Sequence, residues 1–146
     1  MSALSSERIV AEARSWIGTP YRHQASLKGV GCDCLGLVRG VWRGLLGPEP
    51  EKAPSYSADW AEAAGRDQLL EAARRHLVEI PVEDLGPGSV VLFRWRQHLP
   101  AKHAAIVATP TTIVHAYEAA AVAETHLGEW WQRHLFHAFR FPGAID

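Results

Sequence analysis

The stretch Gly31-Cys32-Asp33-Cys34-Leu35-Gly36-Leu37-Val38 predicts a glycine-punctuated loop that enters an apolar helix. Apolar residues recur at helical spacing at positions 35, 38, 41, 42 and 45, until Gly47-Pro48-Glu49-Pro50 ends the pattern. Cys34 is therefore expected in the first turn, where unsatisfied backbone N–H groups and the helix dipole favour a thiolate. A helix terminus contributes only about 1 to 2 kcal/mol, so a strongly acidic thiol also needs a cationic partner.

Two histidines on a predicted β-hairpin are candidates for that partner. The runs 104–108 and 111–116 are apolar and flank Thr109-Pro110, which is typical of a hairpin. A hairpin centred on Thr109 would place His103 directly opposite His115, with Cβ atoms about 5 Å apart. A slip of one residue would put the histidines on opposite faces of the sheet. In the expected register, the thiol and the two histidines would supply a nucleophile, a base and a residue that orients the base.

Other roles for these residues remain open at this point. Zinc ligation by Cys32, Cys34, His103 and His115 has suitable atom types, but the cysteines are only one residue apart, closer than is usual in zinc sites. A Cys32–Cys34 disulfide would close a very small ring in poor geometry. Each candidate can also be a packed core residue. Because Cys32 precedes the predicted helix, it is expected to serve packing only.

Five segments together resemble the NlpC-type papain-like cell-wall cysteine peptidases. The family signature combines a Pro-Tyr-Arg segment, an Asp-Cys-x-Gly-Leu-Val helix start, a Gly-Asp-like strand, a His-x-x-Ile strand and a second histidine. The corresponding segments here are Trp16–Arg22, Gly31–Val38, Pro87–Arg94, His103–Ile106 and Ile113–Ala116. More narrowly, Tyr21–Ala25 and Ala138–Pro142 resemble the branch that is encoded with phage tails and gene transfer agents.

The resemblance implies an α+β fold of papain-like type, in which N-terminal helices carry the nucleophile and pack on an antiparallel β-sheet. It implies Cys34 as the nucleophile, His103 as the base and His115 as the residue that orients the base. Tyr21 matches a tyrosine beside the nucleophile that helps to stabilise the oxyanion. Asp33 matches the family aspartate and is a candidate for substrate binding, but an aspartate at this position can equally cap the helix.

The implied reaction is hydrolysis of an amide bond in a peptidoglycan stem peptide through an acyl-thioester, without a cofactor or metal. The chain departs from many family members by having Leu35 in place of a serine and His23 in place of a tryptophan. Two other functions are considered. One is an acyltransferase or thioesterase of the same fold, and the other is a non-catalytic tail-tip module that binds partner subunits through Trp130 or Trp131.

Composition agrees with an enzyme of one domain over residues 1–146. With 47% hydrophobic residues and six tryptophans, the chain can bury a core without disulfides. A formal net charge of −1 and the lack of a basic run do not indicate nucleic-acid binding. No signal peptide or membrane span is expected. We expect synthesis in the cytoplasm, incorporation in a phage-like particle beside tail-tip or baseplate proteins, and action on the periplasmic cell wall.

The remaining pattern predicts further elements around this site. Ser5 or Ser6 is expected to cap a first helix with apolar positions 9, 10, 13, 16 and 17 on one face. Strands are expected at 89–95, 121–125 and 135–141, with the first buried on both sides. Helices are expected at 57–75 and 127–133, and the segment 82–87 is expected to be a linker.

Overall fold

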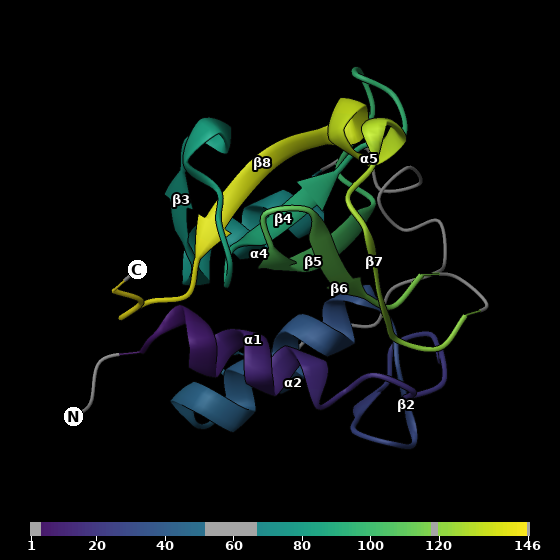
Figure 1. Cartoon of the computed structure of the whole chain (residues 1–146), viewed down its shortest axis with the longest axis vertical. Helices are drawn as coiled ribbons and strands as arrows, with labels where there is room; N and C mark the ends of the chain where they lie inside the picture. Colours follow the sequence, from purple (N-terminus) through teal and green to yellow (C-terminus); the bar gives the residue numbers. More distant parts are fainter. Residues whose placement is uncertain (1–3, 52–66, 118–119, 146) are drawn as a thin grey trace.

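An antiparallel β-sheet forms the centre of the computed structural model, which describes residues 4–51, 67–117 and 120–145. Six strands within these ranges pair in the order β3-β8-β4-β5-β6-β7 (Figure 1). They are β3 (Val78–Ile80), β4 (Val90–Phe93), β5 (His103–Thr109), β6 (Thr112–His115), β7 (Ala123–His126) and β8 (Leu135–Arg140). A separate two-stranded ladder joins β1 (Ser26–Leu27) to β2 (Gly31–Cys32). It lies directly before the helix that begins at Cys34.

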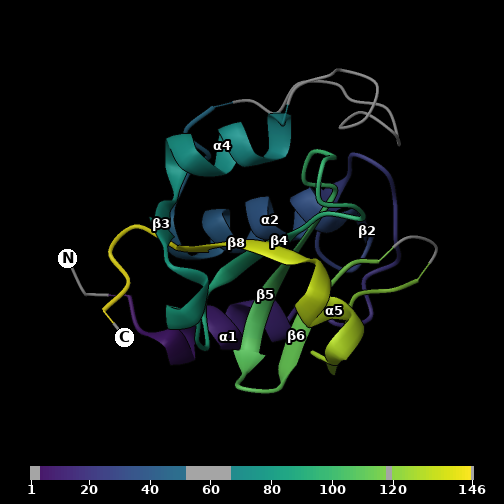
Figure 2. The same cartoon turned by 90° about the horizontal axis from the view of Figure 1, so that it is seen from above.

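The helices that precede the sheet in sequence pack against one of its faces. They are α1 (Ser6–Arg14), α2 (Cys34–Leu46) and α4 (Gln68–His76). Figure 2 shows α2 lying between α1 and α4. The short helix α5 (Glu129–His134) and the 3-10 turn η1 (Val82–Asp84) come later in the chain. This arrangement confirms the predicted α+β class, with N-terminal helices on an antiparallel sheet.

The two faces of the sheet bury two different sets of side chains. Alternate residues of β4 and β5, such as Leu92 and Ile106, join the helices in the larger cluster. Their neighbours Phe93 and Val107 point to the other face, in a cluster that includes Leu127. Because all four residues of β4 are buried, the prediction of a strand covered on both sides is confirmed.

Both N-terminal helices begin at the predicted caps. The Ser5 hydroxyl accepts a hydrogen bond from the Arg8 backbone N–H at 3.2 Å, which supports the start of α1. Trp16 is buried as expected, but Ile17 is 46% exposed, so its predicted inward orientation is wrong. The helix ends at Arg14, so helical spacing no longer sets the direction of the following side chains.

None of the helices within the described ranges is long and apolar enough to cross a membrane.

Several element boundaries differ from the sequence expectations. The helix expected at 57–75 corresponds to α4, which extends to His76, while positions 57–66 lie outside the described residues. Strand β3 is not among the predicted strands, because the run Val78-Glu79-Ile80 is too short for its alternation to indicate a strand. It is an edge strand that pairs only with β8 in the described sheet. The expected linker at 82–87 contains η1.

Candidate functional site

Cys34 is the first residue of α2, as the sequence predicts. Helix α2 contacts β5, and the Ala104 backbone hydrogen-bonds the Cys34 sulfur. Since Ala104 follows His103 directly, the thiol lies against the start of the strand that carries the candidate base. Cys32 is 0% exposed and lies in β2, in agreement with its predicted packing role.

Asp33 holds the helix start and the preceding loop together. One carboxylate oxygen accepts a hydrogen bond from the Gly36 N–H, and the other accepts one from the Gln24 N–H, both at 2.7 Å. Gln24 has a φ of 68°, a left-handed conformation that is unfavourable for a residue with a side chain. A Cβ at position 36 would overlap the Ala25 carbonyl oxygen, so glycine is needed for this close approach. The structure therefore shows the capping role of Asp33 directly.

Tyr21 lies beside the strand that leads to the nucleophile. It forms an isolated parallel bridge with Cys32. The Arg22 N–H donates to the Cys32 carbonyl and the Cys32 N–H donates to the Pro20 carbonyl, each at 3.0 Å. Tyr21 and Cys34 both pack at the margin of the cluster beneath the helices. These contacts bring the predicted oxyanion donor into the neighbourhood of the helix start.

His103 and His115 meet, as predicted, but in a different register. The Nε2 atom of His103 lies 2.9 Å from the Nδ1 atom of His115, and both residues are 4% exposed. The observed pairing joins Val107 to Ile113, so His103 is not directly opposite His115 as expected. A one-residue irregularity lies between Val107 and Thr109, and from Val107 toward His103 the register differs from the expected one by two residues. Because side chains alternate with a period of two, this shift keeps both histidines on the same face.

A third polar side chain, Thr125, extends this pair. Its Oγ1 atom lies 2.9 Å from the Nε2 atom of His115. His103, His115 and Thr125 thus form a hydrogen-bonded row across the adjacent strands β5, β6 and β7. The sequence analysis missed Thr125, since a threonine in a predicted strand has no special signal until the register of that strand is known.

Aromatic rings surround the histidine pair. The His103 ring lies 5.4 Å from Trp131, 6.1 Å from Trp95 and 5.4 Å from Tyr117, measured between ring centroids. The Trp131 ring also meets the His115 ring edge-on at 5.1 Å. Trp130 is 45% exposed, so Trp131 is the inward member of the tryptophan pair. The sequence drew attention to this pair but did not connect it with the histidines.

The buried surroundings favour neutral groups over charged ones. Burial and, to a smaller extent, the Asp33 charge raise the pKa of the Cys34 thiol to about 12, against the effect of three backbone hydrogen bonds. Burial and the neighbouring His115 hold the pKa of His103 well below its usual range. Burial alone lowers the pKa of His115 to about 4. Burial thus opposes the expected thiolate and cationic partner in the substrate-free protein, and it has a larger effect on the Cys34 pKa than the backbone hydrogen bonds at the helix start.

These shifts predict how stability depends on pH. A lowered histidine pKa contributes stability above the unfolded value of about 6.5, and this contribution is lost as pH falls through the folded value. For His115 the loss should reach roughly 3 kcal/mol by about pH 4, with a further loss from His103. Urea unfolding between pH 4.5 and pH 8 should show this decline, and it should be smaller in His115→Asn. A free energy of unfolding that is constant over this range would contradict the burial of neutral imidazoles.

No metal site accompanies these groups in the part of the chain that the structure describes. Within residues 4–51, 67–117 and 120–145, no group of three or more His, Cys, Asp or Glu side chains is arranged to hold a metal ion. The considered zinc set of Cys32, Cys34, His103 and His115 therefore does not form one. A further histidine, His23, lies near the start of α2, with its Nδ1 atom 4.0 Å from an Asp33 carboxylate oxygen.

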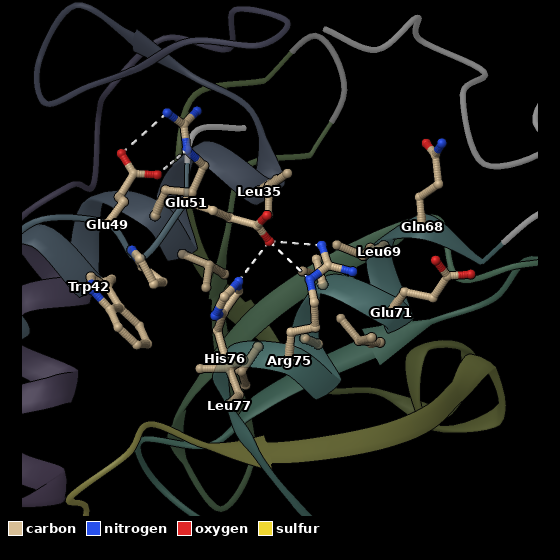
Figure 3. A pocket seen from close by; sticks show the side chains of 18 residues that line it. Leu35, Trp42, Glu49, Glu51, Gln68, Leu69, Glu71, Arg75, His76 and Leu77 are labelled. Carbon is tan, nitrogen blue, oxygen red and sulfur yellow. Dashed lines mark hydrogen bonds and ion pairs between the residues drawn. The ribbon is translucent and has the colours of Figure 1, made fainter. Parts of the chain in front are cut away.

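A cavity of about 400 Å³ lies between α2 and α4, next to the candidate site (Figure 3). Its lining includes Leu35 and Ala104, the residues that directly follow the candidate nucleophile and base. Figure 3 shows the Glu51 carboxylate bonded to both Arg75 and His76 among the lining side chains. Leu35 thus contributes an apolar side chain to this cavity.

Comparisons with known proteins identify the family of the chain. The model of the NlpC/P60 family matches residues 18–140. Over 134 residues, the chain is 28% identical to a gamma-DL-glutamyl hydrolase from Bacillus subtilis (strain 168), covering 91% of this chain and 29% of that protein. The chain therefore spans less than a third of that relative.

Solved structures show the same fold. An NlpC/P60 family protein from Bacillus cereus ATCC 10987 superposes with a TM-score of 0.70 at 18% identity, covering 96% of this chain and 41% of that one. The NlpC/p60 domain of the peptidoglycan hydrolase SagA gives a TM-score of 0.65 at 22% identity, covering 94% of this chain and 100% of that one. The predicted papain-like fold is thereby confirmed. From its match over most of its length, the chain belongs to the NlpC/P60 family.

Proposed function

We propose that this protein is a cysteine peptidase that hydrolyses an amide bond in peptidoglycan stem peptides. The observation that carries the proposal is the placement of Cys34 at the first turn of α2, against the strand that begins with the hydrogen-bonded His103. In this proposal Cys34 is the nucleophile, His103 the base and His115 the orienting group. The substrate class is supported by the family and by the hydrolases among its relatives.

In this proposal the reaction starts from neutral groups. The bond between His103 Nε2 and His115 leaves Nδ1 of His103 for the thiol. As the sulfur attacks the substrate carbonyl, His103 accepts the thiol proton and becomes an imidazolium that His115 holds in place. His103 then protonates the leaving amine, and a thioester forms. Water hydrolyses the thioester with His103 as base, which regenerates the thiol and releases a carboxylic acid.

The developing oxyanion would be held by the Cys34 backbone N–H and the Tyr21 hydroxyl. Replacing Tyr21 by phenylalanine should lower kcat about 100-fold, because loss of one oxyanion donor typically costs 100- to 1,000-fold. The aromatic ring is kept, so the free energy of unfolding should change little. Steady-state kinetics and urea unfolding of the same preparation separate the two effects. An unchanged kcat would leave Tyr21 with a packing role only.

Digestion of purified peptidoglycan is the direct test of the proposed activity. The protein should create new amino and carboxyl termini within stem peptides, which mass spectrometry identifies, and Cys34→Ala should create none. Products cut within the glycan strand, or no products from either protein, would contradict the proposal.

An acyltransferase or thioesterase is the second candidate, and the apolar cavity beside Leu35 favours it. The cavity of about 400 Å³ that Leu35 and Ala104 help to line is large enough for an aliphatic chain. In that case p-nitrophenyl esters should be cleaved faster as the acyl chain lengthens, and peptidoglycan should remain intact.

We further propose that the enzyme acts as part of a phage-like particle. The support is the resemblance of Tyr21–Ala25 and Ala138–Pro142 to the branch encoded with phage tails and gene transfer agents. Such a particle would carry the cytoplasmically made enzyme to the periplasmic cell wall beside tail-tip or baseplate proteins. Purified particles should therefore contain the chain, and its absence from them would contradict this role.

A further inference from the structure

We propose that Thr125 is a positioning residue that selects the tautomer of both candidate catalytic histidines. The inference deepens the proposed function and rests on it. Its basis is the row of two hydrogen bonds, from His103 Nε2 to His115 Nδ1 and from His115 Nε2 to Thr125 Oγ1, each 2.9 Å long. Both lengths fall in the range of well-formed hydrogen bonds.

The row can carry its protons in two ways only. A neutral imidazole has one N–H and one bare nitrogen. When the Thr125 hydroxyl accepts from His115 Nε2, Nδ1 of His115 is bare and accepts from His103 Nε2. Nδ1 of His103 is then bare and can take a proton from the thiol. When Thr125 donates instead, every bond reverses, and His103 carries its proton on Nδ1, where it cannot serve as the base.

Tautomers rather than charges matter here because both rings are kept neutral. The pKa of each histidine is lowered by burial, and the Trp131 ring covers both imidazoles. In such dry surroundings a hydrogen bond strongly influences which ring nitrogen is protonated. The donor or acceptor state of the hydroxyl at the end of the row is therefore coupled to the choice of which ring nitrogen of His103 is unprotonated.

Strand β7, which carries Thr125, is held by its neighbours β6 and α1. Thr125 pairs with Ile113 in the ladder between β6 and β7. Its neighbour Glu124 forms two bonds with the Arg14 guanidinium of α1, at 2.8 and 3.0 Å. These contacts tie β7 to α1 and to β6, so the Thr125 hydroxyl is held beside His115.

Three variants test the proposal. Thr125→Val removes the hydroxyl with little change in shape, while Thr125→Ser keeps it. Thr112→Val is the matched control, because it removes a threonine hydroxyl that bonds across the same two strands but contacts Glu124 and not the histidines. Loss of one hydrogen bond of about 0.5 to 1.5 kcal/mol corresponds to about 3- to 10-fold in an equilibrium or a rate.

Nitrogen-15 NMR of the substrate-free protein at neutral pH gives the primary measurement, because ring nitrogen shifts report which nitrogen carries the proton. We expect His103 protonated at Nε2 in the wild type, in Thr125→Ser and in Thr112→Val, and a mixture of tautomers in Thr125→Val. Thr125→Val should also slow Cys34 alkylation at pH 7 and lower kcat by about 3- to 10-fold with KM unchanged. Thr125→Ser should restore both rates.

Two results would overturn the proposal. One is a His103 tautomer that does not change in Thr125→Val, and the other is an equal change in Thr125→Val and Thr112→Val. The NMR and alkylation measurements need no substrate, so they remain valid if peptidoglycan is not cleaved. In that event the proposed function would fail while the assignment of Thr125 would still be decided by the tautomer.

Discussion

Replacing Cys34 by alanine should abolish hydrolysis, whereas Cys32→Ala should keep most of the activity. Without its nucleophile the protein can only bind and polarise the substrate, and losses of about 10⁴-fold or more are expected for such a change. Cys32 is fully buried in β2 and has no access to substrate. The rate of release of new amino termini from peptidoglycan, measured for both variants, checks this prediction.

Alkylation by iodoacetamide provides an independent check of the same assignment. Cys34 should be labelled before Cys32, because Cys34 is partly exposed while Cys32 is not. Since the Cys34 pKa is raised to about 12, the labelling rate should keep increasing above pH 8 instead of levelling off near pH 6. Equal labelling of both thiols, or an active Cys34→Ala protein, would show that the nucleophile has been assigned wrongly.

Local sequence signals were sufficient to predict the part of the site that depends on neighbouring residues. Cys34 at a helix start and Asp33 as its cap follow from glycines, an aspartate and helical spacing within one short stretch. The meeting of His103 with His115 was also predicted, although the register was shifted by two residues. This prediction succeeded because a register difference of two residues leaves both histidines on the same face of the sheet.

What the sequence did not predict depends on contacts between segments that are far apart. The aromatic enclosure requires α5 to place Trp131 over β5 and β6, which no local pattern specifies. Thr125 becomes visible only when the register of β7 is known. The raised pKa of the thiol follows from its burial between α2 and the sheet, a quantity that the helix position alone cannot supply.

The strongest test of the proposed site compares the losses of activity caused by alanine substitution of His103 and of His115. His103→Ala removes the group that accepts and returns the proton, so kcat should fall by about 10⁴-fold, with slower alkylation of Cys34 at pH 7. His115→Ala should have a smaller effect, because the base is still present but samples unproductive orientations. Both kcat and the pH dependence of alkylation should be measured for each variant. If His115→Ala is the more damaging change, the two roles are reversed.

Asparagine at position 115 separates orientation from tautomer selection. Its carbonyl oxygen stands as many bonds from Cα as Nδ1 of histidine, so it can accept the bond from His103 Nε2. His115→Asn should therefore restore more activity than His115→Gln or His115→Ala. An amide oxygen can only accept a hydrogen bond, whereas Nδ1 of histidine accepts in one tautomer and donates in the other. The asparagine variant therefore does not need the Thr125 hydroxyl to keep an acceptor opposite His103 Nε2. Thr125→Val should then cost almost nothing when it is added to His115→Asn, whereas an undiminished cost would mean that Thr125 acts on His103 by another route.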